Sequence, residues 1–192
     1  MKNVMILMVF LLVGCAVNPT SMVNYSDSQT VASLVTSDTD DYKKITIFRA
    51  PNIAKLPETI EYKANQYLQG DSPENSKVYL RAIRSTEGKQ LTVYQLYISS
   101  NYLASRNSWK FYNEAIDSNG KRLKMNIIDR KVGDCGQYGC SLEETLGITM
   151  LKQDLEEYAL TGLKVKLYSK NGSSQIYYIP GGYIRGFLDY LN

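Results

Sequence analysis

LKVKLYSKNGSSQIYYIP, residues 163–180, holds two apolar-rich segments on either side of an Asn-Gly pair. In the first segment the side chains alternate strictly, with Leu163, Val165 and Leu167 on one side and Lys164, Lys166, Tyr168 and Lys170 on the other. A period of two is typical of a half-buried β-strand. Asn-Gly between two strands predicts a tight hairpin turn. This stretch therefore predicts an antiparallel sheet.

Further strand patterns precede it. They cover residues 43–50, 76–85, 90–99, 109–116, 121–132 and 142–150, and a second Asn-Gly turn lies at 119–120. Two segments, 151–160 and 181–192, instead carry apolar residues at helical spacing. Short connections favour antiparallel pairing. We therefore expect a mainly β (α+β) fold, an antiparallel β-sandwich or curled sheet with one or two helices, including a C-terminal helix.

Composition narrows the possible functions. The chain has 192 residues, no histidine and a formal net charge of +3. Without histidine, the Ser-His and Cys-His nucleophile pairs and the usual zinc ligand are missing. The chain also has no glycine-rich phosphate loop, so we expect neither a cofactor nor a metal. So small a positive charge argues against a nucleic-acid partner.

The N-terminal segment has the layout of a secretory signal. Lys2 is followed by an apolar run, residues 4–13, and the order Leu12-Val13-Gly14-Cys15 closes it. This order closely resembles the lipobox of bacterial lipoproteins. The resemblance implies that residues 1–14 are removed and that acyl chains on Cys15 hold the protein on a membrane. The alternative, an ordinary cleaved signal with a chance cysteine, would leave an unpaired exported thiol.

The residues after Cys15 indicate which membrane holds the protein and how the protein is linked to it. In such lipoproteins an Asp directly after the lipidated cysteine favours the inner membrane, and here that residue is Ala16. The resemblance thus implies the bacterial cell envelope, at the outer membrane facing the periplasm. Ser, Thr, Asp and Asn dominate up to Asp41, so we expect residues 15–41 to be the lipidated cysteine and a flexible tether, in which residues 27–35 suit a short helix turn. Residues 42–192 would then form a single β-rich periplasmic domain.

The other two cysteines lie in CGQYGC, with Cys135 and Cys140 five positions apart around two glycines. In an exported protein a disulfide is the expected state of such a pair. A redox-active pair usually has the spacing C-x-x-C, and a metal site would need two more ligands. We therefore expect a structural disulfide across a flexible loop, worth about 2 kcal/mol in the chain-entropy model.

LEETLGITM, residues 142–150, places a carboxylate among apolar side chains. Strand parity sends four side chains to one face: Leu142, Glu144, Leu146 and Ile148. A buried carboxylate needs a partner, which Arg130 or Arg122 on the preceding predicted strand can supply. As an alternative, Glu144 with Asp129 or Asp134 would form an acid and base pair that cleaves glycan, and a bulge would return Glu144 to solvent. We expect a buried ion pair between Glu144 and Arg130.

The polar face of residues 163–170 is a candidate binding surface, because Lys164, Lys166, Tyr168 and Lys170 share it. A basic face that carries an aromatic ring suits anionic lipid head groups or an acidic protein surface. The alternative is a solvated face whose lysines block unwanted strand pairing.

These features predict a lipid-anchored periplasmic binding or accessory protein of the cell envelope that is not an enzyme. Its partners would be the membrane, through the N-terminal lipid, and an envelope protein or a glycan. The alternative is a peptidoglycan- or glycan-binding or glycan-cleaving protein that uses carboxylates and tyrosines, of which the chain has 16.

Overall fold

The computed structural model describes residues 23–54, 60–61, 76–87, 91–104 and 109–192. Their helices and strands are, in chain order, α1 (Ser28–Leu34), β1 (Thr36–Asp40), β2 (Ile45–Arg49), β3 (Ile60–Glu61), β4 (Lys77–Ser85), β5 (Thr92–Ala104), β6 (Tyr112–Asp117), β7 (Arg122–Gly136), β8 (Gly139–Met150), α3 (Lys152–Thr161), β9 (Leu163–Ser169), β10 (Ser174–Ile179) and α4 (Gly181–Leu191). The expected strands and both expected helices are present.

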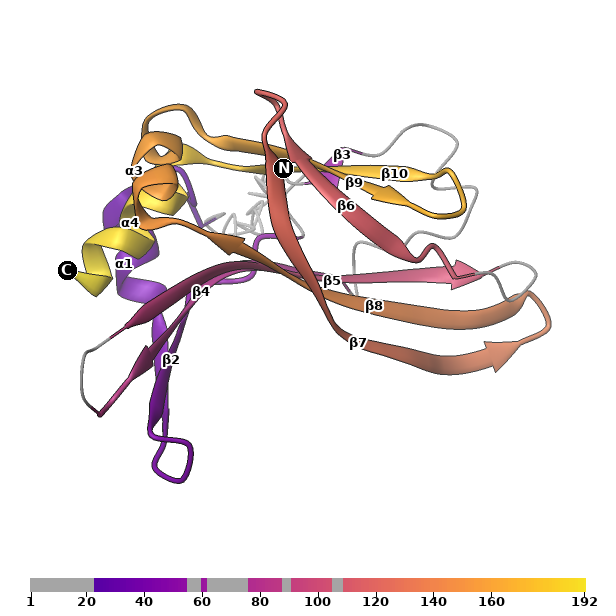
Figure 1. Ribbon diagram of the computed structural model, residues 1–192, viewed down its shortest axis with the longest axis horizontal. Coiled ribbons are helices and arrows are strands. Elements are labelled where there is room, and N and C mark those ends of the chain that lie inside the picture. Colours follow the sequence, from indigo (N-terminus) through magenta and orange to yellow (C-terminus); the bar gives the residue numbers. More distant parts are fainter. Residues whose placement is uncertain (1–22, 55–59, 62–75, 88–90, 105–108) are drawn as a thin grey trace, which may run out of the picture.

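The strands form one antiparallel sheet in the order β1-β2-β4-β5-β8-β7-β6-β9-β10-β3. The sheet curls into a half-barrel, in which β5, β8 and most of β7 make one wall and β6, β9 and β10 the other (Figure 1). β7 joins the walls, because it pairs with β8 along most of its length and with β6 at Arg122 and Leu123. The predicted mainly β fold, with a curled antiparallel sheet and a C-terminal helix, is confirmed.

Both Asn-Gly hairpins form where expected. In each loop the glycine takes the positive φ, +84° at Gly120 and +84° at Gly172. The loops are closed by backbone hydrogen bonds from Asp117 N to Lys121 O, 3.0 Å, and from Ser169 N to Ser173 O, 3.1 Å. They are therefore three-residue loops that end in a left-handed glycine, a common alternative to two-residue turns.

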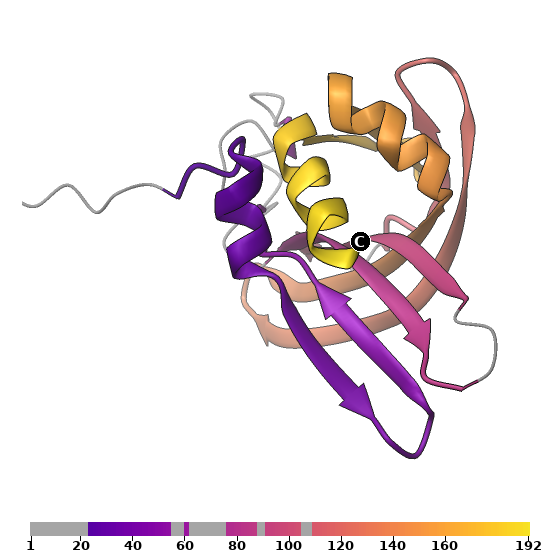
Figure 2. The same ribbon diagram turned by 90° about the vertical axis from the view of Figure 1, so that its left-hand side faces the viewer.

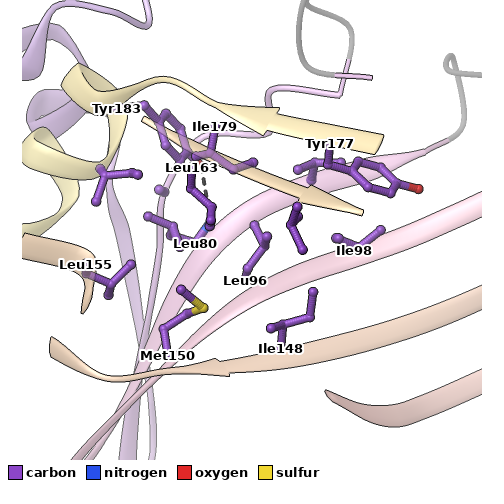
Figure 3. Close-up of a cluster of buried hydrophobic side chains, with 14 of the residues drawn as sticks. Leu80, Leu96, Ile98, Ile148, Met150, Leu155, Leu163, Tyr177, Ile179 and Tyr183 are labelled. Atoms are coloured by element: carbon purple, nitrogen blue, oxygen red, sulfur yellow. Dashed lines mark hydrogen bonds between the residues drawn. The ribbon is translucent and has the colours of Figure 1, made fainter. Parts of the chain in front are cut away.

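The described helices α1, α3 and α4 gather at one end of the half-barrel and cover its open side (Figure 2). The apolar core lies between the walls and these helices, where Leu96, Ile148 and Ile179 face one another (Figure 3). Tyr183 of α4 reaches into this core, accepts a hydrogen bond from Leu80 N at 3.2 Å and donates one to Pro51 O at 2.7 Å. Its burial raises the pKa of the Tyr183 hydroxyl. The polar end of the ring thus docks α4 on the sheet.

The folded domain begins earlier than the sequence suggested. α1 and β1 lie within residues 15–41, the expected tether, and Val31 of α1 is fully buried. α1 packs on α4 at Gly186, where a Cβ would lie 2.8 Å from Val31 Cβ, and Ser26, just before α1, packs at Gly182. Tyr25, before α1, also packs on the core. The folded part therefore reaches back from residue 42 to Tyr25, because α4, distant in the sequence, buries a segment whose own composition is polar.

The signal segment, residues 1–14, and the lipobox cysteine, Cys15, lie outside the described residues. Within the described ranges, no helix combines the length and the apolar character that crossing a bilayer requires.

Candidate functional site

Glu144 is the centre of a polar cluster at the end of the half-barrel away from the helices. Its side chain is fully buried, on the face of β8 that also carries Leu142, Leu146 and Ile148. Four donors reach its carboxylate: Tyr102 Oη at 2.6 Å, Phe111 N at 2.9 Å, Tyr112 N at 3.3 Å and Arg130 Nε at 3.1 Å. They come from β5, β6, β7 and the residue before β6, so this carboxylate ties the two walls together.

Arg130 connects this buried cluster to the surface. Its Nε donates to Glu144, and its guanidinium carbon lies 5.0 Å from the centre of the Phe111 ring. The Arg130 side chain is nevertheless 32% exposed. Its two terminal nitrogens have no hydrogen-bond acceptor among the described residues. The structure thus brings the expected pair Glu144 and Arg130 together and leaves one edge of the guanidinium open.

Phe111 has an unusual backbone conformation. Its φ is +53°, a left-handed value that bulky residues rarely adopt. This conformation ends the extended pattern expected over residues 109–116, so β6 begins at Tyr112. It also turns two consecutive N–H groups, of Phe111 and Tyr112, toward Glu144. Such strained residues persist where their surroundings hold them, and they cluster at functional sites.

The expected disulfide between Cys135 and Cys140 is confirmed. The two cysteines are opposite each other on β7 and β8, with Cα atoms 3.9 Å apart. Gly136 and Gly139 pair next, and Gln137 and Tyr138 form the turn. The expected flexible loop is thus the end of a β-hairpin.

An apolar pocket of about 260 Å³ lies beside this disulfide, lined by Trp109, Val132, Cys140 and Leu142. Its rim is open to solvent, because the Val132 side chain is 60% exposed. Tyr138, in the adjacent turn, is 75% exposed. Exposed apolar side chains that gather beside a pocket are candidates for a binding surface.

The pocket and Arg130 are neighbours. Arg130 and Val132 are two residues apart on β7 and lie opposite Glu144 and Leu142 of β8. On the other side, the Trp109 ring lies 6.1 Å from the Phe111 ring on which Arg130 rests. The arrangement is an apolar hollow with a cation at its edge.

The structure does not assemble the acid and base pair of the catalytic alternative. Asp129 lies opposite Thr145, the residue after Glu144, so the two carboxylates point to opposite faces of the sheet. Lys131 Nζ lies 3.0 Å from Asp129 Oδ2, and this hydrogen bond lowers the pKa of Asp129. Asp134 is exposed on β7. Arg122, the other expected partner of Glu144, pairs with Glu114 at 2.9 Å.

The basic face is only partly assembled. Lys164, Lys166 and Tyr168 of β9 share a shallow hollow of about 200 Å³ with Ile116, Asp117, Ser118 and Ile176. Lys166 Nζ lies 4.7 Å from the centre of the Tyr168 ring. Lys170 follows the end of β9, in the turn, and does not line the hollow. The three residues that meet are those that alternate within the strand.

Sequence reasoning missed four contributors to the site: Tyr102, Trp109, Phe111 and Val132. Each was part of a predicted strand or lay beside one, without a motif to single it out. The described part of the chain contains no cluster of His, Cys, Asp and Glu suited to a metal.

No protein-family model matches this chain, and no curated protein and no solved structure is significantly similar to it.

Proposed function

We propose that this protein is a lipid-anchored binding or accessory protein of the bacterial cell envelope, and that it binds its partner at the end of the half-barrel formed by β7 and β8. The observation that carries this proposal is the exposed apolar surface beside the disulfide, with the pocket lined by Trp109, Val132, Cys140 and Leu142. Open apolar pockets with a few polar groups at their edge are the usual form of binding sites.

The geometry around Glu144 supports binding over glycan cleavage. A glycosidase needs two carboxyl groups that flank one bond at a fixed separation. Glu144 is buried and accepts hydrogen bonds from four donors, and Asp129 points away from it. In this proposal Glu144 is a structural residue that orients Arg130.

The proposed location in the envelope rests on the lipobox resemblance. The position of Tyr25, just before α1, limits how far the domain would lie from the membrane. Nine residues separate Cys15 from Tyr25, which packs on the core. A chain of that length spans at most about 35 Å, whatever its conformation. An anchored Cys15 would therefore hold the helical end of the domain close to the membrane surface. This favours a partner in the envelope, with the periplasmic face of the outer membrane as the proposed site.

Site-specific photo-crosslinking in intact cells tests this proposal. A photoreactive residue at Val132 should capture one partner, whereas the same residue at Tyr42, which is 99% exposed in the turn between β1 and β2, should not. Cys15→Ser should move the protein out of the membrane fraction and abolish capture. Equal capture from both positions would contradict the binding end, and a Cys15→Ser protein that stays in the membrane would contradict the anchor.

The same variants address the glycan alternative. Isolated peptidoglycan should not retain the protein. If peptidoglycan retains the wild type and Val132→Asp equally, the ligand is a glycan and not a protein partner, and it binds at a surface other than the one around Val132.

A further inference from the structure

We infer that the pocket beside the disulfide binds the C-terminal residue of a partner polypeptide, with an apolar side chain in the pocket and the terminal carboxylate on Arg130. This inference rests on the proposed function, because it names the chemistry of the partner that the same site would bind.

Arg130 is placed and oriented to receive a carboxylate. A guanidinium presents a planar fork that matches a carboxylate with two parallel hydrogen bonds. Glu144 engages only Nε, and the Phe111 ring supports the guanidinium plane, so the orientation is fixed before a ligand arrives. The terminal nitrogens have no acceptor among the described residues, and the side chain reaches solvent.

The local charge suits an anion. Glu144 is offset by Arg130 and by its three other donors, and Lys131 is paired with Asp129. Lys110 also lies beside the cluster, with Nζ 4.3 Å from the centre of the Tyr102 ring. The carboxylates of Glu144 and Asp129 both have close donors of their own, so neither faces an incoming anion unpaired.

The size of the pocket suits one side chain. At about 260 Å³ it is smaller than the pockets of about 300–1,000 Å³ that usually enclose small molecules. Its lining from Trp109, Val132, Cys140 and Leu142 offers apolar contact. An apolar group with a carboxylate one or two bonds away, as in a terminal residue, would reach both the pocket and Arg130.

β7 also offers backbone groups to a short extended chain. Beyond Leu123, its edge away from β8 has no strand partner among the described residues. The register on the β8 side shifts between Ile127 and Asp129 and again between Val132 and Cys135, so the regular run beside the pocket is the short one at Asp129–Val132. A regular run this short suits the last few residues of a chain, because strand addition and carboxylate capture then occur together.

Trp109 makes the test direct, because it is the only tryptophan in the chain and lines the pocket. The full-length protein carrying Cys15→Ser, which has no acyl chain to occupy the pocket, is titrated with N-acetyl-L-phenylalanine while Trp109 fluorescence is recorded. N-acetyl-L-phenylalaninamide, which lacks the carboxylate, should bind at least tenfold more weakly, since charge-assisted hydrogen bonds contribute about that much affinity.

Three variants complete the test. Arg130→Lys keeps the charge but loses the fork, and should weaken binding of the acid at least fivefold while leaving the amide unchanged. Val132→Asp, at an exposed position that tolerates a polar residue, should abolish binding and leave the fold intact. Arg122→Lys, on the same strand but paired with Glu114, is the matched control and should bind as the wild type does.

Several results would overturn the inference. Equal affinity for the acid and the amide would mean that Arg130 does not read a carboxylate. Tighter binding of octanoate than of N-acetyl-L-phenylalanine would assign the site to fatty acids. No change in Trp109 fluorescence with any of these probes would mean that the pocket binds no such group. In each case, crosslinking from Val132 in cells would still report separately on the proposed function.

Discussion

Glu144 is completely buried, whereas Arg130, whose Nε lies 3.1 Å from the Glu144 carboxylate, keeps a third of its side chain in solvent. The burial of a carboxylate is tolerated only when donors surround it, and here the backbone of two neighbouring residues supplies half of them. The buried carboxylate therefore holds a surface cation in a fixed position, and the two do not form an ion pair that is sealed in the core.

Replacing the Glu144 carboxylate should show how much the stability of the protein depends on it. Glu144→Gln keeps the volume but turns an amide N–H₂ toward groups that are all donors. We expect the free energy of unfolding to fall by about 2–4 kcal/mol, measured by urea denaturation. Glu143→Gln is the matched control, because Glu143 accepts a 2.7 Å hydrogen bond from Ser99 on the other face of β8, and it should cost about 1 kcal/mol. Equal losses in the two variants would contradict the role of Glu144.

The contact between α1 and α4 should tolerate no added methyl group. A Cβ at Gly186 would meet the Ser28 carbonyl oxygen and Val31, so Gly186→Ala should destabilise the protein by about 1–3 kcal/mol and release α1. Thermal unfolding and proteolysis near α1 measure these effects. Gly136→Ala is the control, since nothing lies within 4 Å of a Cβ there. An unchanged melting temperature in Gly186→Ala would mean that α1 does not dock as described.

The disulfide should stabilise the hairpin and shape the pocket. Replacing both Cys135 and Cys140 with alanine should lower the free energy of unfolding by about 2 kcal/mol for so short a loop. The emission of Trp109 should also change, because Cys140 lines the same pocket. Alkylation of the folded wild type should label these two thiols only after reduction, and labelling without reductant would contradict the pairing.

The lowered pKa of Asp117 predicts that the protein loses stability in acid. Burial alone would raise the pKa of this carboxyl, but hydrogen bonds from the Tyr158 hydroxyl, Lys121 N and Asn119 N outweigh burial and hold the pKa below its ordinary value of 3.8. As the pH falls through this range, the unfolded chain takes up the proton first, so the stabilisation is present above about pH 4 and is lost below it.

Two variants measure this contribution. The difference in unfolding free energy between wild type and Asp117→Asn, followed in urea from pH 6 to pH 2.5, should narrow as the pH falls. Tyr158→Phe, which removes the side-chain donor, should cost about 1.5–3 kcal/mol at pH 6 and less at pH 2.5. A difference that stays constant across this range would contradict the assignment.

Periodicity in the sequence predicted the strands and two helices well. Once one face of a strand is buried, the alternation of apolar residues determines which side chains lie on that face. The sequence pattern placed a short helix turn at residues 27–35, where α1 forms, but assigned it to the tether, because the residues are mostly polar and the helix is stabilised by Val31 packing near Gly186. It missed β1. It also missed β3, which has two residues. These elements depend on contacts between distant parts of the chain, which a local pattern does not contain.

For the site, strand parity identified Glu144 and its partner Arg130, because the two lie opposite each other on one face of the sheet. The pocket was not predictable, since it depends on the conformation of Phe111 and on the position of Trp109 beside Val132. The composition of β9 gave its polar face, but the turn after Ser169 separates Lys170 from Lys164 and Lys166. The sequence showed which side chains each strand carries, but not which of them lie close together in the fold.

The packing of α1 on α4 also governs the order in which the protein can fold. α1 spans Ser28–Leu34 and its binding surface belongs to residues 181–191, so about 150 residues must be synthesised between a helix and its support. Until α4 arrives, Val31 and the open side of the half-barrel face solvent. A chain that emerges from its N-terminus would therefore pass through a partly apolar stage, in which a chaperone has a surface to bind before the native state closes.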